Sequence, residues 1–141
     1  MKNKNKPRLD TYETHYDVDL VVANKYVKLE ELQKLYKYVS DNELDENVID
    51  GAATTNICRR KSDNKLTMLV YLADNQSYKP SDSYKFIYDI NTAAHEAAHV
   101  CFDIYDYCGV LVEPQNQEHT AYFIGYLTEC IMKTMLNKWV T

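Results

Sequence analysis

The amino-acid sequence predicts an α+β fold, in which a small antiparallel or mixed sheet of about three strands packs against a pair of long C-terminal helices and one N-terminal helix. Two observations predict it. Segments of alternating polarity lie in the first half, whereas apolar residues recur every three or four positions in the second half. A chain of 141 residues is long enough for one domain with its own core. We therefore expect a single domain over residues 13–141, preceded by a flexible arm over residues 1–12.

The first half supplies the expected strands and one helix. Residues 15–23 alternate and are rich in Val, which is typical of a strand. Residues 27–39 carry apolar side chains at helical spacing, which predicts a helix that covers the sheet. Residues 53–60 and 65–73 flank the polar segment 61–64, which predicts a β-hairpin.

Two long helices are expected in the second half. A polar linker over residues 74–84 leads into the first helix, over about residues 88–107, and Gly109 ends it. The second helix covers about residues 115–139 and begins after Pro114, a residue type favoured in the first helical turn.

Composition excludes several classes of protein. The net charge of -5 argues against a nucleic-acid binder, because phosphate binding depends on clusters of Lys and Arg. No apolar segment approaches the eighteen residues or so that a membrane span needs. The four cysteines form no Cys-x-x-Cys pair, and the basic N-terminal residues are not followed by the apolar segment of a secretory signal. We expect a cytoplasmic protein.

Residues 95–99 read HEAAH, an H-E-x-x-H motif inside the first long helix. Residues four apart lie above one another on a helix, so His95 and His99 can bind one metal ion, most commonly zinc. Glu96 lies beside them. A carboxylate there can accept a proton from water activated by the metal, as metal hydrolases require.

A catalytic zinc site usually has a third protein ligand. The candidates are acidic or histidine side chains on or near the last helix, because an antiparallel helix pair brings this helix past the histidines: Glu113, Glu118, His119 and Glu129. Glu118 is preferred. The residues between it and His99 are enough to finish one helix, turn at Gly109 and begin the next.

The segment from residue 88 to about residue 130 resembles the gluzincin metallopeptidases, especially their aminopeptidase branch, in the pattern HExxH, eighteen residues, then Glu. Residues 117–121, QEHTA, are similar to the Asn-Glu-x-x-Ala pattern around that family's third ligand. The segment also resembles small HExxH proteins encoded by phages and mobile elements. These resemblances imply a zincin-like helix pair, a zinc ion held by His95, His99 and Glu118, and Glu96 as general base.

The motif predicts a zinc-dependent metallopeptidase that acts on a peptide or protein substrate. We expect the peptide to add itself as a strand to an exposed sheet edge, and residues 65–73 are the expected edge because they directly precede the motif helix. Tyr122 and Tyr126 follow Glu118 by four and eight residues. They are candidates to hydrogen-bond a zinc ligand from the same helix face, and packing in the core is the alternative role.

Two other interpretations stay open. The chain could be a non-catalytic accessory or inhibitory protein of a mobile element that binds a host protein through a surface rich in its thirteen tyrosines, with a structural or vestigial metal site. A cysteine–histidine nucleophile ranks third among the interpretations. Cys101 and Cys108 are predicted to be core thiols, which argues against a catalytic role for them.

Overall fold

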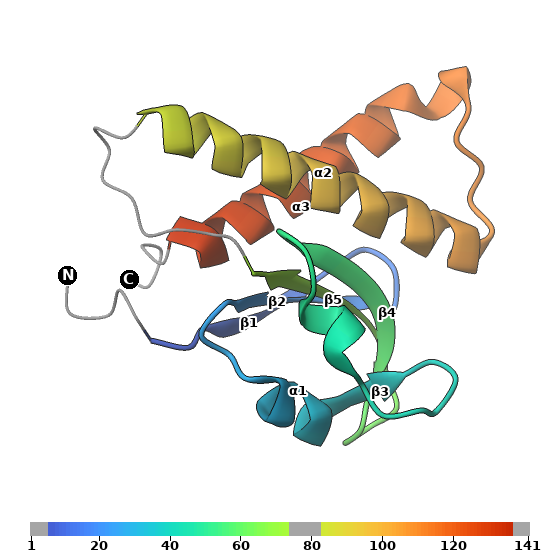
Figure 1. The fold of residues 1–141 in the computed structure, drawn as a ribbon. Coiled ribbons are helices and arrows are strands. Elements are labelled where there is room, and N and C mark those ends of the chain that lie inside the picture. Colours follow the sequence, from blue (N-terminus) through green and yellow to red (C-terminus); the bar gives the residue numbers. More distant parts are fainter. Residues whose placement is uncertain (1–5, 74–82, 137–141) are drawn as a thin grey trace.

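A mixed sheet of five strands lies between two layers of helices in the computed structural model, which describes residues 6–73 and 83–136 (Figure 1). The strands are β1 (Leu9–Glu13), β2 (Asp19–Asn24), β3 (Tyr36–Tyr38), β4 (Thr54–Arg60) and β5 (Leu66–Leu72). The helices are α1 (Leu29–Leu35), α2 (Ser83–Cys108) and α3 (Gln117–Leu136), with short 3-10 helices η1 (Glu46–Ile49) and η2 (Pro114–Asn116). Figure 1 shows α2 and α3 crossing over one face of the sheet and α1 on the opposite side.

The strands follow the spatial order β1-β2-β5-β4-β3. β2 and β5 pair in parallel, and the other three pairs are antiparallel. The predicted α+β class is thus confirmed, with five strands where about three were expected. The two additional strands, β1 and β3, come from segments that were predicted as an arm and as part of a helix.

The prediction of a flexible arm over residues 1–12 is wrong for residues 9–12, which belong to a strand. Leu9–Glu13 form β1, which pairs with β2 from Leu9 opposite Ala23 to Glu13 opposite Asp19. Arg8 also forms an ion pair with Asp10. Polar side chains concealed this strand because β1 is at the edge of the sheet and exposes one face to solvent. Residues 1–5 lie outside the described part of the chain.

The predicted helix over residues 27–39 ends early. α1 stops at Leu35, and Tyr36–Tyr38 continue as β3, which pairs with β4 between Tyr36 and Arg60. Alternating tyrosines favour a strand once a partner edge is available, and tertiary pairing overrides the helical spacing here. The strand expected over residues 15–23 begins only at Asp19, because the Thr14 hydroxyl donates to the carbonyls of Tyr16 and Val18 and closes a turn.

The predicted hairpin is confirmed as β4 and β5, but the predicted position of its second arm is wrong. β5 lies between β2 and β4, and all seven of its residues are buried. Residues 65–73 therefore cannot offer an exposed edge to a peptide. Besides the end strands β1 and β3, β4 has a free edge of its own, because β3 pairs only with Cys58–Arg60 and no described strand pairs with the outer side of residues 54–57.

Two apolar cores fill the spaces on either side of the sheet. The larger one lies under α2 and α3 and includes Leu20, Val22, Met68, Val70, Ala97, Val100, Ile104, Leu127 and Ile131. The smaller one lies under α1 and η1 and includes Val21, Leu32, Leu44, Val48 and Leu69. Alternate residues of β2 and β5 enter different cores, as the pleat of a strand requires. α2 is therefore fixed against the centre of the sheet.

Both long helices are present and differ slightly from their predicted ends. α2 starts at Ser83, inside the predicted linker, of which residues 74–82 lie outside the described chain. Gly109 ends α2 with a φ of 75°, a conformation that glycine adopts without steric cost. α3 follows η2, and residues 137–139 of its predicted range are not described. Within residues 6–73 and 83–136, no helix has the length and apolar character needed to cross a membrane.

Candidate functional site

His95 and His99 lie side by side on the outward face of α2. Their Nε2 atoms are 3.2 Å apart, and the two rings stand at 77° to each other. Both side chains are exposed. The spacing of four residues accounts for this arrangement, because it places one imidazole above the other on the same face, near the middle of the helix.

The spacing of the two nitrogens fits a bound zinc ion. Zn–N bonds of about 2.0–2.1 Å at the tetrahedral angle hold two nitrogens about 3.3 Å apart. The observed 3.2 Å between His95 and His99 agrees with that value. A hydrogen bond between a protonated and an unprotonated ring nitrogen has a similar length. Both interpretations need the two Nε2 atoms to face one another, as they do here.

Glu96 faces the sheet and is buried, with 5% of its surface exposed. Its Oε1 accepts a hydrogen bond of 2.6 Å from the Thr55 hydroxyl of β4. Its Oε2 lies 4.0 Å from His95 Nε2. One carboxylate oxygen is thus held by the sheet while the other is directed to the histidine pair, which is the position that a general base beside a metal site needs.

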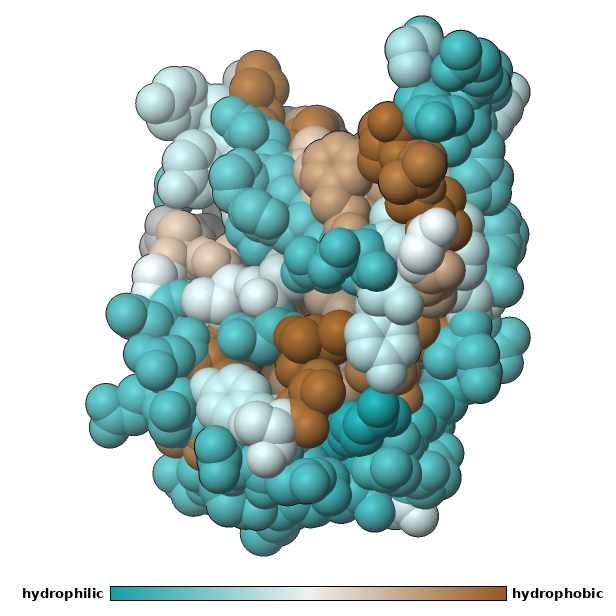
Figure 2. Space-filling view, turned by 90° about the vertical axis from the view of Figure 1, so that its right-hand side faces the viewer, coloured by the Kyte–Doolittle hydropathy of each residue, from teal (hydrophilic) through white to brown (hydrophobic). Residues whose placement is uncertain are grey.

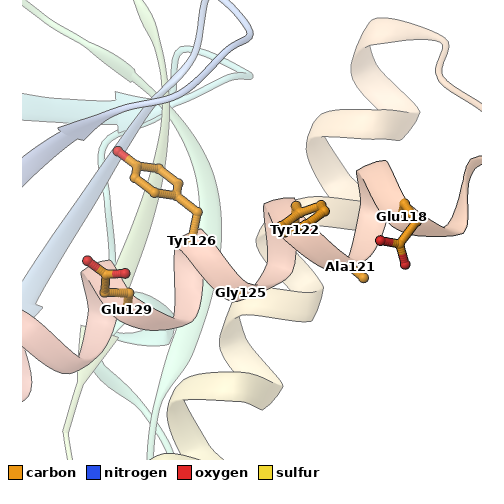
Figure 3. Close-up of a pocket in the computed structure, with 6 residues that line it drawn as sticks. All are labelled: Glu118, Ala121, Tyr122, Gly125, Tyr126 and Glu129. Atoms are coloured by element: carbon orange, nitrogen blue, oxygen red, sulfur yellow. The ribbon is translucent and has the colours of Figure 1, made fainter.

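Glu118, the predicted third ligand, lies on the outward face of α3. It lines a groove of about 550 Å³ with other residues of the same helix: Ala121, Tyr122, Gly125, Tyr126 and Glu129 (Figure 3). Within the described residues, no three or more His, Cys, Asp or Glu side chains gather closely enough to hold one ion. The structure therefore brings His95 and His99 together but does not add Glu118 to them.

The other candidates for a third ligand have different surroundings. Glu113 caps η2 by accepting a hydrogen bond from the backbone of Asn116. His119 Nε2 lies 2.8 Å from the Tyr16 hydroxyl. Glu129 forms an ion pair of 3.0 Å with Lys133. Each of these side chains has a partner in its own part of the molecule.

Tyr122 and Tyr126 were predicted to hydrogen-bond a zinc ligand. Tyr122 has 75% of its surface exposed. The Tyr126 hydroxyl donates to the backbone carbonyl of Glu13, 2.7 Å away, so this side chain joins α3 to the end of β1. Burial raises the pKa of Tyr126 to about 12, and the phenol stays protonated. Tyr126 thus has a structural partner in place of the predicted one.

The cysteines are all free. Burial raises the pKa of the Cys101 thiol to about 11, so it carries little thiolate at neutral pH. Cys108 is exposed at the end of α2, contrary to its prediction as a core thiol. The raised pKa thus makes Cys101 a poor nucleophile at neutral pH.

Thr55 is the residue of this site that the sequence did not indicate. It lies on β4, far from the motif in sequence, and its hydroxyl contacts Glu96 because β4 packs beneath α2. A threonine in a strand is ordinary and carries no spacing signal. The sequence offered one signal for Thr55. It lies two residues from Ile57 in the first arm of the predicted hairpin, so both side chains share the face that packs under the helices.

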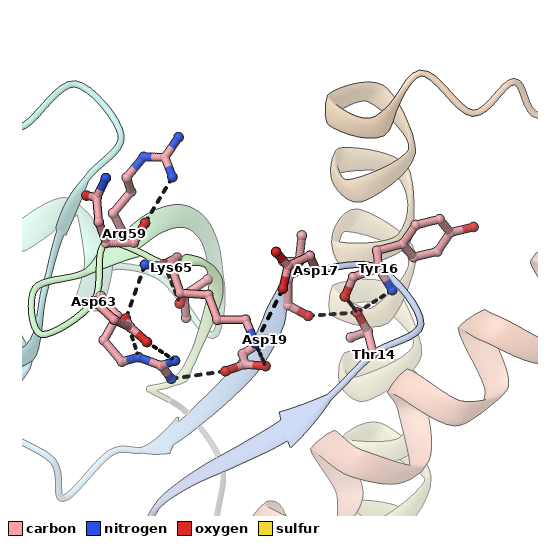
Figure 4. Close-up of polar contacts among 11 residues, drawn as sticks. Thr14, Tyr16, Asp17, Asp19, Arg59, Asp63 and Lys65 are labelled. Carbon is pink, nitrogen blue, oxygen red and sulfur yellow. Dashed lines mark hydrogen bonds and ion pairs between the residues drawn. The ribbon is translucent and has the colours of Figure 1, made fainter.

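The β4–β5 turn holds a second charged cluster, which has a structural role (Figure 4). Asp19, 5% exposed, accepts from Arg60 at 3.0 Å and lies 3.2 Å from the Lys65 ammonium. Arg60 also binds Asp63 at 2.8 Å, and this guanidinium holds the pKa of Asp63 down to about 2. The basic groups of the cluster are thus paired with carboxylates of the same chain and fix the turn to β2.

Large apolar side chains are exposed on the helical layer. They include Tyr84, Ile87, Tyr88 and Phe102 on α2, Leu111 and Val112 after it, and Tyr122 on α3. Figure 2, turned to show the right-hand side of Figure 1, shows apolar residues in a hollow between two upper projections.

No protein-family model matches the chain, and searches of curated proteins and of solved structures returned no match. The gluzincin resemblance therefore stays a prediction based on residues 88–130.

Proposed function

We propose that the chain is a zinc-dependent metallopeptidase in which His95 and His99 hold the metal and Glu96 is the general base. The observation that carries the proposal is the geometry of this trio. Two Nε2 atoms stand 3.2 Å apart, and a buried carboxylate oxygen lies 4.0 Å from one of them. A helix that only needed a polar outer face would not require a buried carboxylate beside the pair.

Each group has a defined task in this proposal. Zinc at the two imidazoles would supply the Lewis acid that polarises the scissile carbonyl and lowers the pKa of the attacking water. Glu96 accepts the proton of that water at Oε2 and returns it to the leaving amine. The third protein ligand, predicted as Glu118, stays a prediction, because the described residues do not place it beside the histidines.

The free edge of β4 supports a peptide as the substrate. Lys61 N–H bonds to Leu35 on the outer side, whereas Arg60 N–H bonds to Lys65 on the β5 side. Successive residues of an antiparallel strand direct their backbone N–H and C=O groups to opposite sides. The N–H and C=O groups of Thr55 and Ile57 therefore point to the outer edge. An extended peptide can add there as a further strand, beside the element that carries Glu96.

Metal analysis of the purified protein tests the metal-binding part. We expect about one zinc per chain, lost in His95→Ala and kept in His15→Ala, a matched control whose ring stacks on Phe123 away from the pair. Glu118→Gln tests the predicted third ligand: lower zinc content supports it, and unchanged content removes it. A parent protein without zinc after exposure to the metal would refute the proposal.

Cleavage of unfolded casein, followed by mass spectrometry, tests the catalytic part. Glu96→Gln keeps the shape of the side chain but cannot accept a proton, so we expect bound zinc and a loss of cleavage of about 100-fold or more. A variant that cleaves as fast as the parent would remove Glu96 from the mechanism.

A second candidate function is a non-catalytic, protein-binding role. The exposed aromatic and aliphatic side chains of α2, with Tyr84 at 84% exposure, favour it. This role does not need Glu96. Binding of a partner unchanged by Glu96→Gln, together with a fourth protein ligand closing the metal site, would favour it over catalysis.

A further inference from the structure

We propose that Thr55 is the positioning residue for Glu96, and that it connects the base to the strand edge at which substrate binds. This inference rests on the proposed function and adds a residue to it. Thr55 would touch neither metal nor scissile bond. It acts through Glu96, whose carboxylate it holds in place.

The contact between the two side chains is short and specific. Thr55 Oγ1 donates to Glu96 Oε1 at 2.6 Å, a short hydrogen bond between a hydroxyl and a carboxyl oxygen. Among the described residues, Thr55 is the one that hydrogen-bonds the Glu96 side chain. A buried carboxylate without a donor is costly, so the Thr55 hydroxyl decides which rotamer Glu96 adopts.

The bond also sets the direction of the second oxygen. With Oε1 fixed to β4, Oε2 is turned toward the histidine pair, 4.0 Å from His95 Nε2. Without the donor, the flexible Glu96 side chain can rotate about its own bonds and leave that position. A displacement of about 1 Å at a catalytic group can reduce the rate about 100-fold.

Thr55 belongs to a rigid part of the sheet and to its free edge at the same time. It pairs with Val70 of the buried strand β5. Its backbone N–H and C=O face the outer edge, by the alternation set at Arg60 and Lys61. A peptide that adds to β4 would therefore bond the backbone of the residue whose side chain holds the base, which fixes the reacting carbonyl relative to Glu96.

The test compares Thr55→Val with Thr55→Ser on a quenched fluorescent peptide, built on the casein sequence that the parent cleaves fastest. Valine keeps the shape and removes the hydroxyl, and serine keeps the hydroxyl. The matched control is Thr54→Val, because Thr54 is the neighbouring threonine on β4, whose hydroxyl donates to the Val48 carbonyl beneath the opposite face. Zinc content and melting temperature are measured for every variant.

We expect Thr55→Val to lower kcat about 10- to 100-fold while KM and zinc content stay within about twofold. Thr55→Ser should stay within about threefold of the parent, and Thr54→Val should keep the parent kcat. A structural role alone would lower the melting temperature and would not separate kcat from KM. If Thr55→Val does not fold, Thr55→Ala takes its place in the comparison.

Two results would overturn the inference alone: a kcat for Thr55→Val within twofold of the parent, or a Thr55→Ser variant as slow as Thr55→Val. Both leave the metallopeptidase intact. A Glu96→Gln variant that cleaves casein as fast as the zinc-loaded parent would instead overturn the proposed mechanism, and the role of Thr55 with it. The two failures are therefore distinguishable.

Discussion

Replacing Gly125 with alanine should stabilise the protein. Gly125 lies within α3, in the groove of Figure 3, and its φ is not positive. A Cβ added there meets no atom within 4 Å. The backbone therefore does not need a glycine at this position, and glycine only widens the range of conformations open to the unfolded chain.

The size of the effect follows from helix propensity and chain length. Alanine in a helix interior is favoured over glycine by about 0.5–1 kcal/mol. The unfolding entropy is about 2.1 cal/mol/K per residue, or roughly 0.3 kcal/mol/K for the 141 residues of this chain. Gly125→Ala should therefore raise Tm by about 2–3 °C.

Thermal and urea denaturation, followed by circular dichroism, measure the change. The matched control is Ala121→Gly, one turn earlier in the same groove, which should lower Tm by a similar amount. An unchanged m-value would show that the shift reports stability alone. A lower Tm for Gly125→Ala would refute the reasoning, because it would mean that another backbone or ligand approaches this face of α3.

Two further predictions concern polar contacts. Thr134 is buried and its hydroxyl donates to Asp10 at 2.7 Å, so Thr134→Val should lower the unfolding free energy by about 1–3 kcal/mol in urea denaturation; an unchanged midpoint would contradict this. Arg60 holds the pKa of Asp63 at about 2, below its usual 3.8. Asp63 therefore stabilises the fold above about pH 4, and this contribution disappears as pH falls through 2. Asp63→Asn should lower Tm at pH 7 but not below pH 2, and a difference independent of pH would exclude the ion pair as its cause.

The sequence indicates the buried elements of this fold better than its edges. β5 and the two long helices have patterns set by burial, and the sequence locates them within a few residues. β1 and β3 are edge strands whose identity depends on a neighbour, so Leu9–Glu13 read as an arm and Tyr36–Tyr38 as helix. The central place of β5 was missed because chain order does not fix strand order when a crossover intervenes.

The candidate site divides in the same way. His95, Glu96 and His99 are close in sequence, so helical spacing alone predicts that the histidines meet, and the structure has them 3.2 Å apart. Thr55 is brought to Glu96 only by packing of β4 under α2, which no local pattern encodes. The position of Glu118 depends on the crossing of two helices, and the structure places it in the α3 groove.

Because β2 pairs in parallel with β5, the sheet beneath α2 cannot be complete until β5 has been synthesised. One edge of β2 pairs with β1, its neighbour in sequence. The other edge pairs with β5, where Asp19 lies opposite Thr67, so this pairing closes a long loop of the chain. β4 pairs with the other edge of β5, and α2 packs on the face of the sheet that these strands share. A C-terminal fragment that begins at residue 83 would carry both imidazoles but lack Thr55, whose hydroxyl donates to Glu96. A graft of the helical motif onto another scaffold would therefore keep this hydrogen bond only if part of β4 were transferred with it.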